Sequence, residues 1–566
     1  MINMIQNAKD QVSALVEQAY KTAVEKGQLA AAEAEIRGNV EVPKDTRNGD
    51  YTSNFALAGA KALKMRPRDL AQLLVDNLVL DGTYFSKVEI AGPGFLNFTV
   101  NDKWYGEVLS AVEAEGMDYG TSDMGHGERV MVEFVSANPT GPMTIGNARG
   151  GVLGDTLASV LKKTGHDVWR EFYVNDAGNQ VDKFGRSIEA RYLQILHGED
   201  AIEFPEDGYH GMDIVEMAQR IYDRDGDKYK DTPSEERQRI FAEFGVPFNI
   251  ALMQKHLERY RIKFDNWFLE SSLHKSGYVA ETVDLLTQGG HTYEKDGALW
   301  LRNTDFGAEK DECLRRSNGF YTYYAVDIAY HRNKFIERKF DRVIDVWGAD
   351  HHGHAIRFKA SMTDPVLGIN ADKLDFLIML MVRLVRDGET VKVSKRTGKA
   401  LTLNDLLDEI SVDACRFFFN AKPDTHLEFD LGLAVREDSE NPVYYVQYAH
   451  ARICSLLKMM ASENVSVASM KDVDVSVLED EAARDLIKQI SLYPEELRLA
   501  ARDYDPSRIN RYLITLAARF HKFYNADRIK GEAEAVVNAR LKLADTVRSV
   551  LENGLEVIGV TAPDHM

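Results

Sequence analysis

Cysteine is scarce in this chain of 566 residues. Its three cysteines, Cys313, Cys415 and Cys454, lie far apart and form no CxxC pair. A disulfide framework needs more cysteines, and a zinc knuckle needs them in closely spaced pairs. The sequence therefore excludes both of these classes, and we expect the three residues to be buried thiols.

Long apolar runs are also missing. No stretch reaches the roughly 20 apolar residues that cross a bilayer. The first residues, MINMIQNAKDQV, lack the cationic and apolar segments of a secretory signal. We expect a soluble, cytoplasmic protein with no membrane partner.

Positive charge is in deficit. The chain has 69 Lys and Arg against 89 Asp and Glu, which gives a formal net charge of −20. An acidic body repels a polyanion at long range, so indiscriminate nucleic-acid binding is disfavoured and DNA is not expected as a partner. A specific basic track remains compatible with this charge.

A buried strand, a turn-rich loop and a helix are predicted in succession between residues 129 and 161. The mostly apolar run at 130–135 is typical of a strand in a parallel sheet, and apolar periodicity resumes at Ile145. The loop contains the turn-forming residues Asn138, Pro139, Gly141 and Pro142. In doubly wound α/β folds such a junction lies at the carboxyl edge of the sheet, where helix amides bind phosphate. Gly141 and Gly146 would let a nucleotide approach the backbone.

Two later segments are predicted to return to the same sheet edge. In RSNGFYTYYAVDIAY at 316–330, Tyr323 and Asp327 would share one helix face because they are four residues apart. The segment DRVIDVWGADHHGH predicts a strand followed by the polar residues Asp350, His351 and His352. His and Asp are common metal ligands, but adjacent residues seldom converge on one ion and no third ligand cluster accompanies them in the sequence. We expect no protein-bound metal.

A lysine-rich segment, VKVSKRTGK at 391–399, follows the turn at Asp387-Gly388. Taken alone, such a charge run is typical of a solvated loop. Alternatively, Lys392 and Lys395 could fold over the phosphates of a nucleotide and neutralise their charge. From Leu401 onward the apolar spacing is helical almost throughout, which predicts a helical bundle at the carboxyl terminus.

Several motifs resemble those of one family. ANPTGPMTIGN at 137–147 resembles the HIGH signature of class I aminoacyl-tRNA synthetases in its arginyl form, although Thr144 and Asn147 replace both histidines; their hydroxyl and amide can still donate hydrogen bonds. VKVSKRTGK resembles the KMSKS loop, with Val393 in place of Met. GDYTSNFALAGAKAL, AGPGFLNF and the final APDHM are similar to the terminal domains of arginyl-tRNA synthetases, so the resemblance spans nearly the whole chain.

The resemblance implies an α/β protein: a Rossmann-type parallel-sheet catalytic domain, an N-terminal α+β accessory domain and a C-terminal all-α helical bundle. The expected ranges are 1–115 for the tRNA-binding accessory domain, 116–400 for the catalytic domain with a helical insertion around 196–245, 401–440 for a connector, and 441–566 for the anticodon-binding bundle.

The implied activity is that of an arginine–tRNA ligase using ATP with Mg²⁺, with L-arginine and tRNA(Arg) as partners and a monomer as the expected state. The residues expected to bind ATP are Pro139, Gly141, Thr144, Gly146, Asn147, Lys392 and Lys395. Those expected to act in catalysis are Thr144, Asn147, Lys392, Ser394 and Lys395. Those expected to bind arginine are Glu133, Asn138, Tyr323, Asp327 and His351.

For the tRNA, aromatic residues of the bundle are the candidates, because splayed bases stack on aromatic rings. These are Tyr445, Tyr448, Phe520, Phe523 and Tyr524. Core packing is the competing interpretation for each ring. Arg452, Lys522 and Arg528 are candidate phosphate contacts or plain surface charges.

Two other functions remain open at this point. One is a class I synthetase or nucleotidyl transferase for another small acid, which would share the sheet and the lysine segment. The other is a non-catalytic tRNA-binding paralogue, motivated by the missing HIGH histidines.

Overall fold

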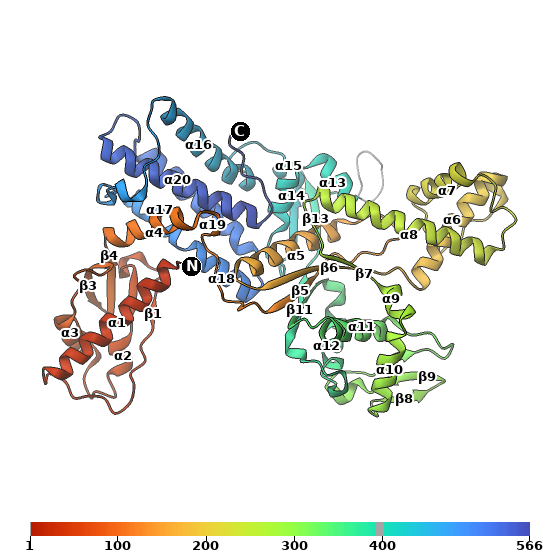
Figure 1. Ribbon diagram of the computed structural model, residues 1–566, viewed down its shortest axis with the longest axis horizontal. Helices are drawn as coiled ribbons and strands as arrows, with labels where there is room; N and C mark the ends of the chain where they lie inside the picture. Colours follow the sequence, from red (N-terminus) through yellow and green to blue (C-terminus); the bar gives the residue numbers. More distant parts are fainter. Residues whose placement is uncertain (1, 392–400) are drawn as a thin grey trace.

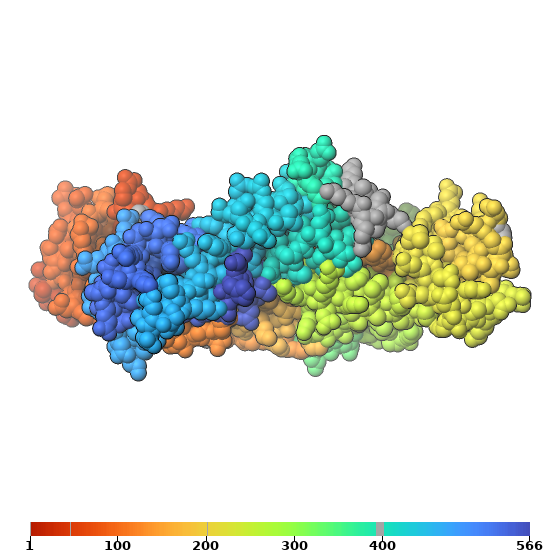
Figure 2. All heavy atoms as spheres, turned by 90° about the horizontal axis from the view of Figure 1, so that it is seen from above, coloured from red at the N-terminus to blue at the C-terminus, as the bar shows by residue number. Residues whose placement is uncertain are grey.

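The computed structural model of the chain describes residues 2–391 and 401–566. The molecule is elongated, with the amino-terminal domain at one end, a helical projection at the other, and a parallel sheet between them (Figures 1 and 2). Within the described residues, no helix is long and apolar enough to cross a membrane.

The amino-terminal domain is α+β, as predicted. An antiparallel sheet of order β1-β2-β4-β3 is covered by helices. Its strands are Val40–Glu41, Tyr51–Ser53, Phe95–Val100 and Phe85–Ala91 in that order. Its helices are α1 (Met4–Glu25), α2 (Phe55–Gly59), α3 (Pro67–Asn77) and α4 (Asp102–Glu115). The face of α1 that packs on the sheet is apolar and buried, including Val12 and Val16.

The central sheet is parallel, with strand order β12-β11-β5-β6-β7, which confirms the predicted fold class. In that order the strands are Leu374–Met379, Arg342–Gly348, Arg129–Glu133, Asp167–Val174 and Asn266–Leu269. Helix α5 (Ile145–Lys163) follows β5 and packs against one face of the sheet, in contact with β5, β6 and β11. Strand β5 ends at Glu133 rather than Val135, because Val135 and Ser136 adopt φ angles of 70° and 41° that break the extended backbone.

Three helices, α6 (Asn179–His197), α7 (Met212–Asp225) and α8 (Ser234–Arg259), form the helical projection. They enclose a separate apolar cluster that includes Phe184, Ile188 and Phe241. The sequence predicted a helical insertion around 196–245. In the structure α6, which starts at Asn179, also contributes to this cluster, so the projection begins earlier.

Beside the central sheet lie α9 (Glu270–Lys275), α10 (Tyr278–Gln288), α11 (Tyr323–Arg332), α12 (His352–Ser361) and a small antiparallel sheet of β8 (Thr292–Lys295), β9 (Ala298–Leu301) and β10 (Glu312–Arg315). A third sheet joins β13 (Val382–Arg386) to β14 (Glu389–Thr390) and, in parallel, to β15 (Leu427–Asp430). The connecting helices are α13 (Leu403–Glu409), α14 (Val412–Phe419) and α15 (Leu431–Ala434).

The carboxyl-terminal part is the predicted helical bundle. Its helices are α16 (Pro442–Ser462), α17 (Glu481–Ser491), α18 (Tyr493–Asp503), α19 (Ser507–Ala526) and α20 (Glu534–Val557). The bundle also packs on the catalytic part, where the fully buried Arg416 of α14 bonds to Asp155 of α5 and to the carbonyl of Ile558.

Candidate active site

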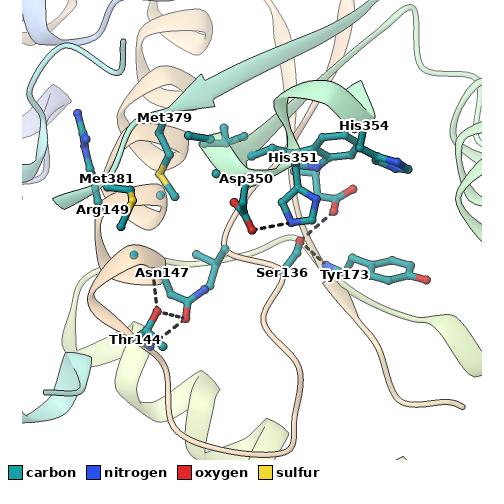
Figure 3. A pocket seen from close by; sticks show the side chains of 18 of the residues that line it. Ser136, Thr144, Asn147, Arg149, Tyr173, Asp350, His351, His354, Met379 and Met381 are labelled. Atoms are coloured by element: carbon teal, nitrogen blue, oxygen red, sulfur yellow. Dashed lines mark hydrogen bonds and ion pairs between the residues drawn. The ribbon is translucent and has the colours of Figure 1, made fainter. Parts of the chain in front are cut away.

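The first helix of the catalytic sheet begins at the predicted nucleotide-binding turn. Thr144 is the N-cap of α5, and its Oγ1 accepts a hydrogen bond from the backbone N of Asn147 at 3.3 Å. In return, Asn147 Oδ1 accepts from the N and Oγ1 of Thr144, both at 2.9 Å (Figure 3). This reciprocal box stabilises the helix start, and the Asn147 amide NH₂ is not used by it. The residues that replace the HIGH histidines therefore have a structural role as well.

The turn is also joined to the chain just beyond the lysine segment. Thr144 and Thr402 form an antiparallel β-bridge, and Leu403 N donates to Met143 O at 2.9 Å. Thr402 is itself the N-cap of α13. Lys392, Ser394 and Lys395 lie outside the described residues, but their carboxyl-terminal flank is fixed against the N-cap of α5.

A cavity of about 1040 Å³ opens at the carboxyl edge of the parallel sheet. It brings together the turn, through Thr144, Gly146 and Asn147, and the α11 residues Tyr323 and Asp327. His351 also lines it and stands at its rim, 3.5 Å from Asp350 (Figure 3). The edge of the sheet is where parallel α/β folds bind ligands. The structure thus places together seven residues predicted for ATP or arginine: Glu133, Thr144, Gly146, Asn147, Tyr323, Asp327 and His351.

Three predicted loop residues, Asn138, Pro139 and Gly141, are not among the described residues that line the cavity. The carbonyl of Pro139 accepts a bond of 2.9 Å from Asn249 Nδ2 of α8, so Pro139 anchors the loop to the helical projection. A side chain at Gly141 would face Asp213 of α7. Asn138 is exposed. In this structure Pro139 and Gly141 shape the loop, and their proposed contact with ATP stays a prediction.

The carboxylate of Asp327 points toward the cavity from the first turns of α11. Its Oδ2 lies 3.3 Å from Nε2 of His354, whose ring stacks on Trp347 with centroids 5.5 Å apart. Tyr323 is 49% exposed at the mouth. Burial, and then the charge of Glu270, raise the pKa of Tyr323, so its hydroxyl stays protonated and can donate.

A second acid, Glu270, was missed from the sequence. It follows β7 directly, is buried, and accepts a hydrogen bond of 2.6 Å from the hydroxyl of Tyr173, which lines the cavity. Burial, and then the charges of Glu270 and Asp327, raise the pKa of Tyr173, so both acids face this one ring. The sequence offers one partial signal, because Glu270 directly follows the apolar residues of NWFL, but it does not show that this segment joins the sheet of β5.

Glu133, predicted to bind arginine, lines the cavity but is also paired inside the protein. Its Oε2 lies 2.6 Å from the ammonium of the buried Lys334, and its Oε1 accepts from Ser136 Oγ at 2.9 Å. A carboxylate already paired with an internal cation is a poor ligand for a substrate guanidinium. Glu133 frames the cavity. Among the described residues, the acids Asp327 and Asp350 also line it, and Glu270 is hydrogen-bonded to the lining residue Tyr173.

The bundle carries a group of aromatic and basic side chains, here called the α16–α19 patch: Tyr444, Tyr445, Tyr448, Arg452, His521 and Tyr524. Tyr444 and Tyr448 stack at an interplanar angle of 7°, and the Arg452 guanidinium lies 4.1 Å from the ring centre of Tyr524. Tyr448 is 40% exposed. Tyr444 and His521 were not predicted as members of this patch. Tyr444 lies beside Tyr448 because the two are four residues apart on α16, and His521 of α19 stacks on Tyr448.

Two of the predicted stacking rings are corrected. Phe520 and Phe523 are 0% exposed and belong to the apolar core of the bundle. Neither ring can meet a base in this conformation, so core packing is the correct interpretation for both. Lys522 on α19 and Arg528, which follows the end of that helix, are both exposed.

Among the described residues, one histidine–cysteine–carboxylate group, His450, Cys454 and Asp564, has its polar atoms within 4.8 Å of one another. His450 Nδ1 lies 2.9 Å from the carbonyl oxygen of Pro563. A carbonyl only accepts, so this nitrogen carries a proton and donates. We interpret the group as a clamp that holds the last residues against α16.

Comparison with known proteins identifies the family of this chain. Three family profiles cover the chain in order: the arginyl tRNA synthetase N terminal domain over residues 8–100, the class I (R) tRNA synthetase catalytic domain over 108–430, and the DALR anticodon binding domain over 446–566. The chain belongs to the arginyl-tRNA synthetase family. The membership predicted from the motifs is thereby confirmed.

Relatives within the arginyl-tRNA synthetase family cover the whole chain. The arginine–tRNA ligases of Acetivibrio thermocellus and of Caldanaerobacter subterraneus subsp. tengcongensis are each 50% identical over 567 residues, with 100% of both chains covered. The arginyl-tRNA synthetase structure from Thermus thermophilus shares the fold with a TM-score of 0.72 at 22% identity, covering 98% of this chain and 100% of that one.

Proposed function

We propose that the chain is an arginine–tRNA ligase. It activates L-arginine with ATP to arginyl-adenylate, transfers the arginyl group to the 3′-terminal adenosine of tRNA(Arg), and releases AMP and pyrophosphate. The observation that carries this proposal is one cavity in which the α5 turn meets Asp327, while Thr402, which follows the lysine segment in the sequence, is paired with Thr144 of that turn. We expect it to act in the cytoplasm as a monomer.

The ATP end of the cavity is the start of α5. The backbone amide of Gly146 and the dipole of α5 favour phosphate, and the side-chain NH₂ of Asn147 can add a neutral donor. Lys392, Ser394 and Lys395 are proposed to close over the outer phosphates. Mg²⁺ would arrive with ATP, because no carboxylate among the described residues of the α5 turn faces the cavity there.

The arginine end lies between α11 and the end of β7. We propose that Asp327 and Glu270 receive the guanidinium, whose fork of donors matches a carboxylate, and that Tyr323 adds its hydroxyl. A lysine ammonium cannot copy this two-point contact. His351 and the exposed Asn138 remain the proposed contacts of the α-carboxylate and α-amino groups.

The chemistry needs no protein nucleophile. The carboxylate of arginine attacks the α-phosphate of ATP, and pyrophosphate leaves. A ribose hydroxyl of the tRNA then attacks the mixed anhydride and releases AMP. The protein contributes positioning and stabilisation of the charge on the phosphates, which fits a site of amides, lysines and fixed acids.

The α16–α19 patch is the proposed contact for the anticodon loop, with Tyr445, Tyr448 and Tyr524 stacking on unpaired bases and Arg452 near the phosphates. Acidic regions elsewhere would keep other nucleic acids away.

Charging assays test the proposal. Purified protein, ATP, Mg²⁺ and unfractionated tRNA are incubated with labelled arginine, lysine or citrulline. The proposal expects arginyl-tRNA alone. Charging with another amino acid would favour a different class I specificity, and tRNA binding without any charging would favour the non-catalytic paralogue.

A further inference from the structure

Beneath the cavity, one ammonium group lies wholly inside the protein. Lys334 belongs to the π-helical turn Asn333–Glu337 that follows α11, and its side chain is 0% exposed. Its Nζ lies 2.6 Å from Glu133 Oε2 and 2.9 Å from Asp345 Oδ1. A buried ammonium is costly unless it is paired, so these two carboxylates fix its position.

The two carboxylates need a cation because they are neighbours in the sheet. Glu133 on β5 and Asp345 on β11 stand opposite each other in the parallel register, and both are buried. Burial raises the pKa of Glu133, and the charge of Asp345 adds to the rise while Lys334 opposes it. Without Lys334, two like charges would face each other away from water.

The same group reaches α11 through His331. Nε2 of its ring lies 2.6 Å from Asp345 Oδ2, and Nδ1 lies 2.8 Å from the backbone oxygen of Asp327. The ring of His331 therefore bridges the side chain of Asp345 and the backbone of α11. Lys334 thus holds one end of a chain of contacts whose other end is the backbone of the proposed guanidinium ligand.

We propose that Lys334 is a positioning residue that sets the selectivity for arginine over lysine. By occupying Glu133, the internal ammonium removes that carboxylate as a partner for a substrate ammonium. Through Asp345 and His331, it also holds the turn of α11 that presents Asp327. This inference rests on the proposed function, because it concerns how the same cavity chooses its amino acid.

The Lys334→Met variant is the first test. With the ammonium gone, Glu133 is released toward the cavity and α11 loses an anchor. We expect the KM for arginine to rise about tenfold or more, since the contact to a desolvated charge is misplaced, while the KM for ATP changes by less than about twofold. The ratio of kcat/KM for arginine to that for lysine should fall, because released Glu133 can pair with an ammonium.

Arg338→Met is the matched control. Arg338 bonds to Glu171, another fully buried carboxylate of the sheet, at 2.6 Å between Nη1 and Oε1. Its loss also leaves a buried acid without its cation, so it should lower stability as Lys334→Met does. The KM for arginine and the arginine-to-lysine ratio should stay at the wild-type values.

The double variant Lys334→Met/Asp345→Asn keeps the inference testable if the single variant folds poorly. Removing one negative charge restores the charge balance around Glu133. The double variant should therefore be more stable than Lys334→Met, and its KM for arginine should lie between those of Lys334→Met and wild type. If wild-type protein charges arginine, and folded Lys334→Met or the double variant keeps the wild-type selectivity for arginine over lysine, the inference is overturned. Failure of the wild-type protein itself to charge arginine would overturn the proposed function instead.

Discussion

Thr144 and Thr402, the N-caps of two helices, are paired in a β-bridge although 258 residues separate them. Thr144 opens α5 within the first signature, and Thr402 opens α13 just after the lysine segment. The pairing therefore fixes the start of α13 beside the start of α5, at the end of the cavity lined by Thr144. The positive end of a helix suits a phosphate.

Asn147→His tests whether the departure from HIGH matters for rate. The substitution adds an imidazole donor but removes the Oδ1 acceptor of the capping box. We expect charging activity equal to or higher than wild type, with a loss of about 0.5–1 kcal/mol in the free energy of unfolding. Steady-state charging and denaturant unfolding measure the two effects. A large drop in kcat in a stable variant would show that the Asn147 amide is essential.

Asp327→Ala removes the carboxylate that α11 presents to the cavity. Loss of a desolvated charged pair with the guanidinium should raise the KM for arginine by about tenfold or more. Glu281→Ala is the control. It removes an exposed carboxylate of the neighbouring helix α10 that pairs with Arg332 of α11, and it should leave this KM unchanged. An unchanged KM in Asp327→Ala would remove Asp327 from the pocket.

Glu270→Gln tests the acid that the sequence pattern did not reveal. The amide keeps the shape of the side chain and can still accept from Tyr173, so folding should be little affected. The KM for arginine should rise by about tenfold or more, because a neutral amide cannot neutralise a guanidinium. A Glu270→Gln variant that binds arginine with the wild-type KM and rejects the uncharged analogue citrulline as strongly as wild type would show that Glu270 is structural only.

Tyr448→Ala and Phe520→Ala should fail in different ways. Tyr448 is exposed in the α16–α19 patch, so its loss should raise the KM for tRNA with little change in stability; one stacked base is worth about 1–3 kcal/mol. Phe520 is buried in the bundle, so its loss should cost roughly 3–5 kcal/mol of stability. Thermal unfolding and tRNA titration separate the two outcomes. Equal effects on tRNA binding in both variants would contradict this division.

The sequence predicted what local chemistry determines. The strand, turn and helix around Thr144 and the shared face of Tyr323 and Asp327 follow from short spacings, and the structure contains them. Membership of the family rested on motifs, and the comparisons confirmed it. These features need only neighbours along the chain.

What the sequence missed depends on contacts across the fold. The pairing of Glu133 with Lys334 joins residues 201 positions apart and gives Glu133 an internal partner that the sequence did not reveal. The burial of Phe520 is decided by how α19 packs in the bundle, since an apolar helix face does not say which ring is covered. Glu270 needed the knowledge that β7 lies in the same sheet as β5.

The most direct measurement of the central claim is ATP–pyrophosphate exchange with arginine in the presence of tRNA, in wild-type protein and in Lys395→Ala. If the α5 turn and the lysine segment grip one triphosphate, wild type should exchange and Lys395→Ala should lose about a hundredfold in kcat with the KM for arginine nearly unchanged. Exchange at the wild-type rate in Lys395→Ala, or none in wild-type protein, would contradict the account.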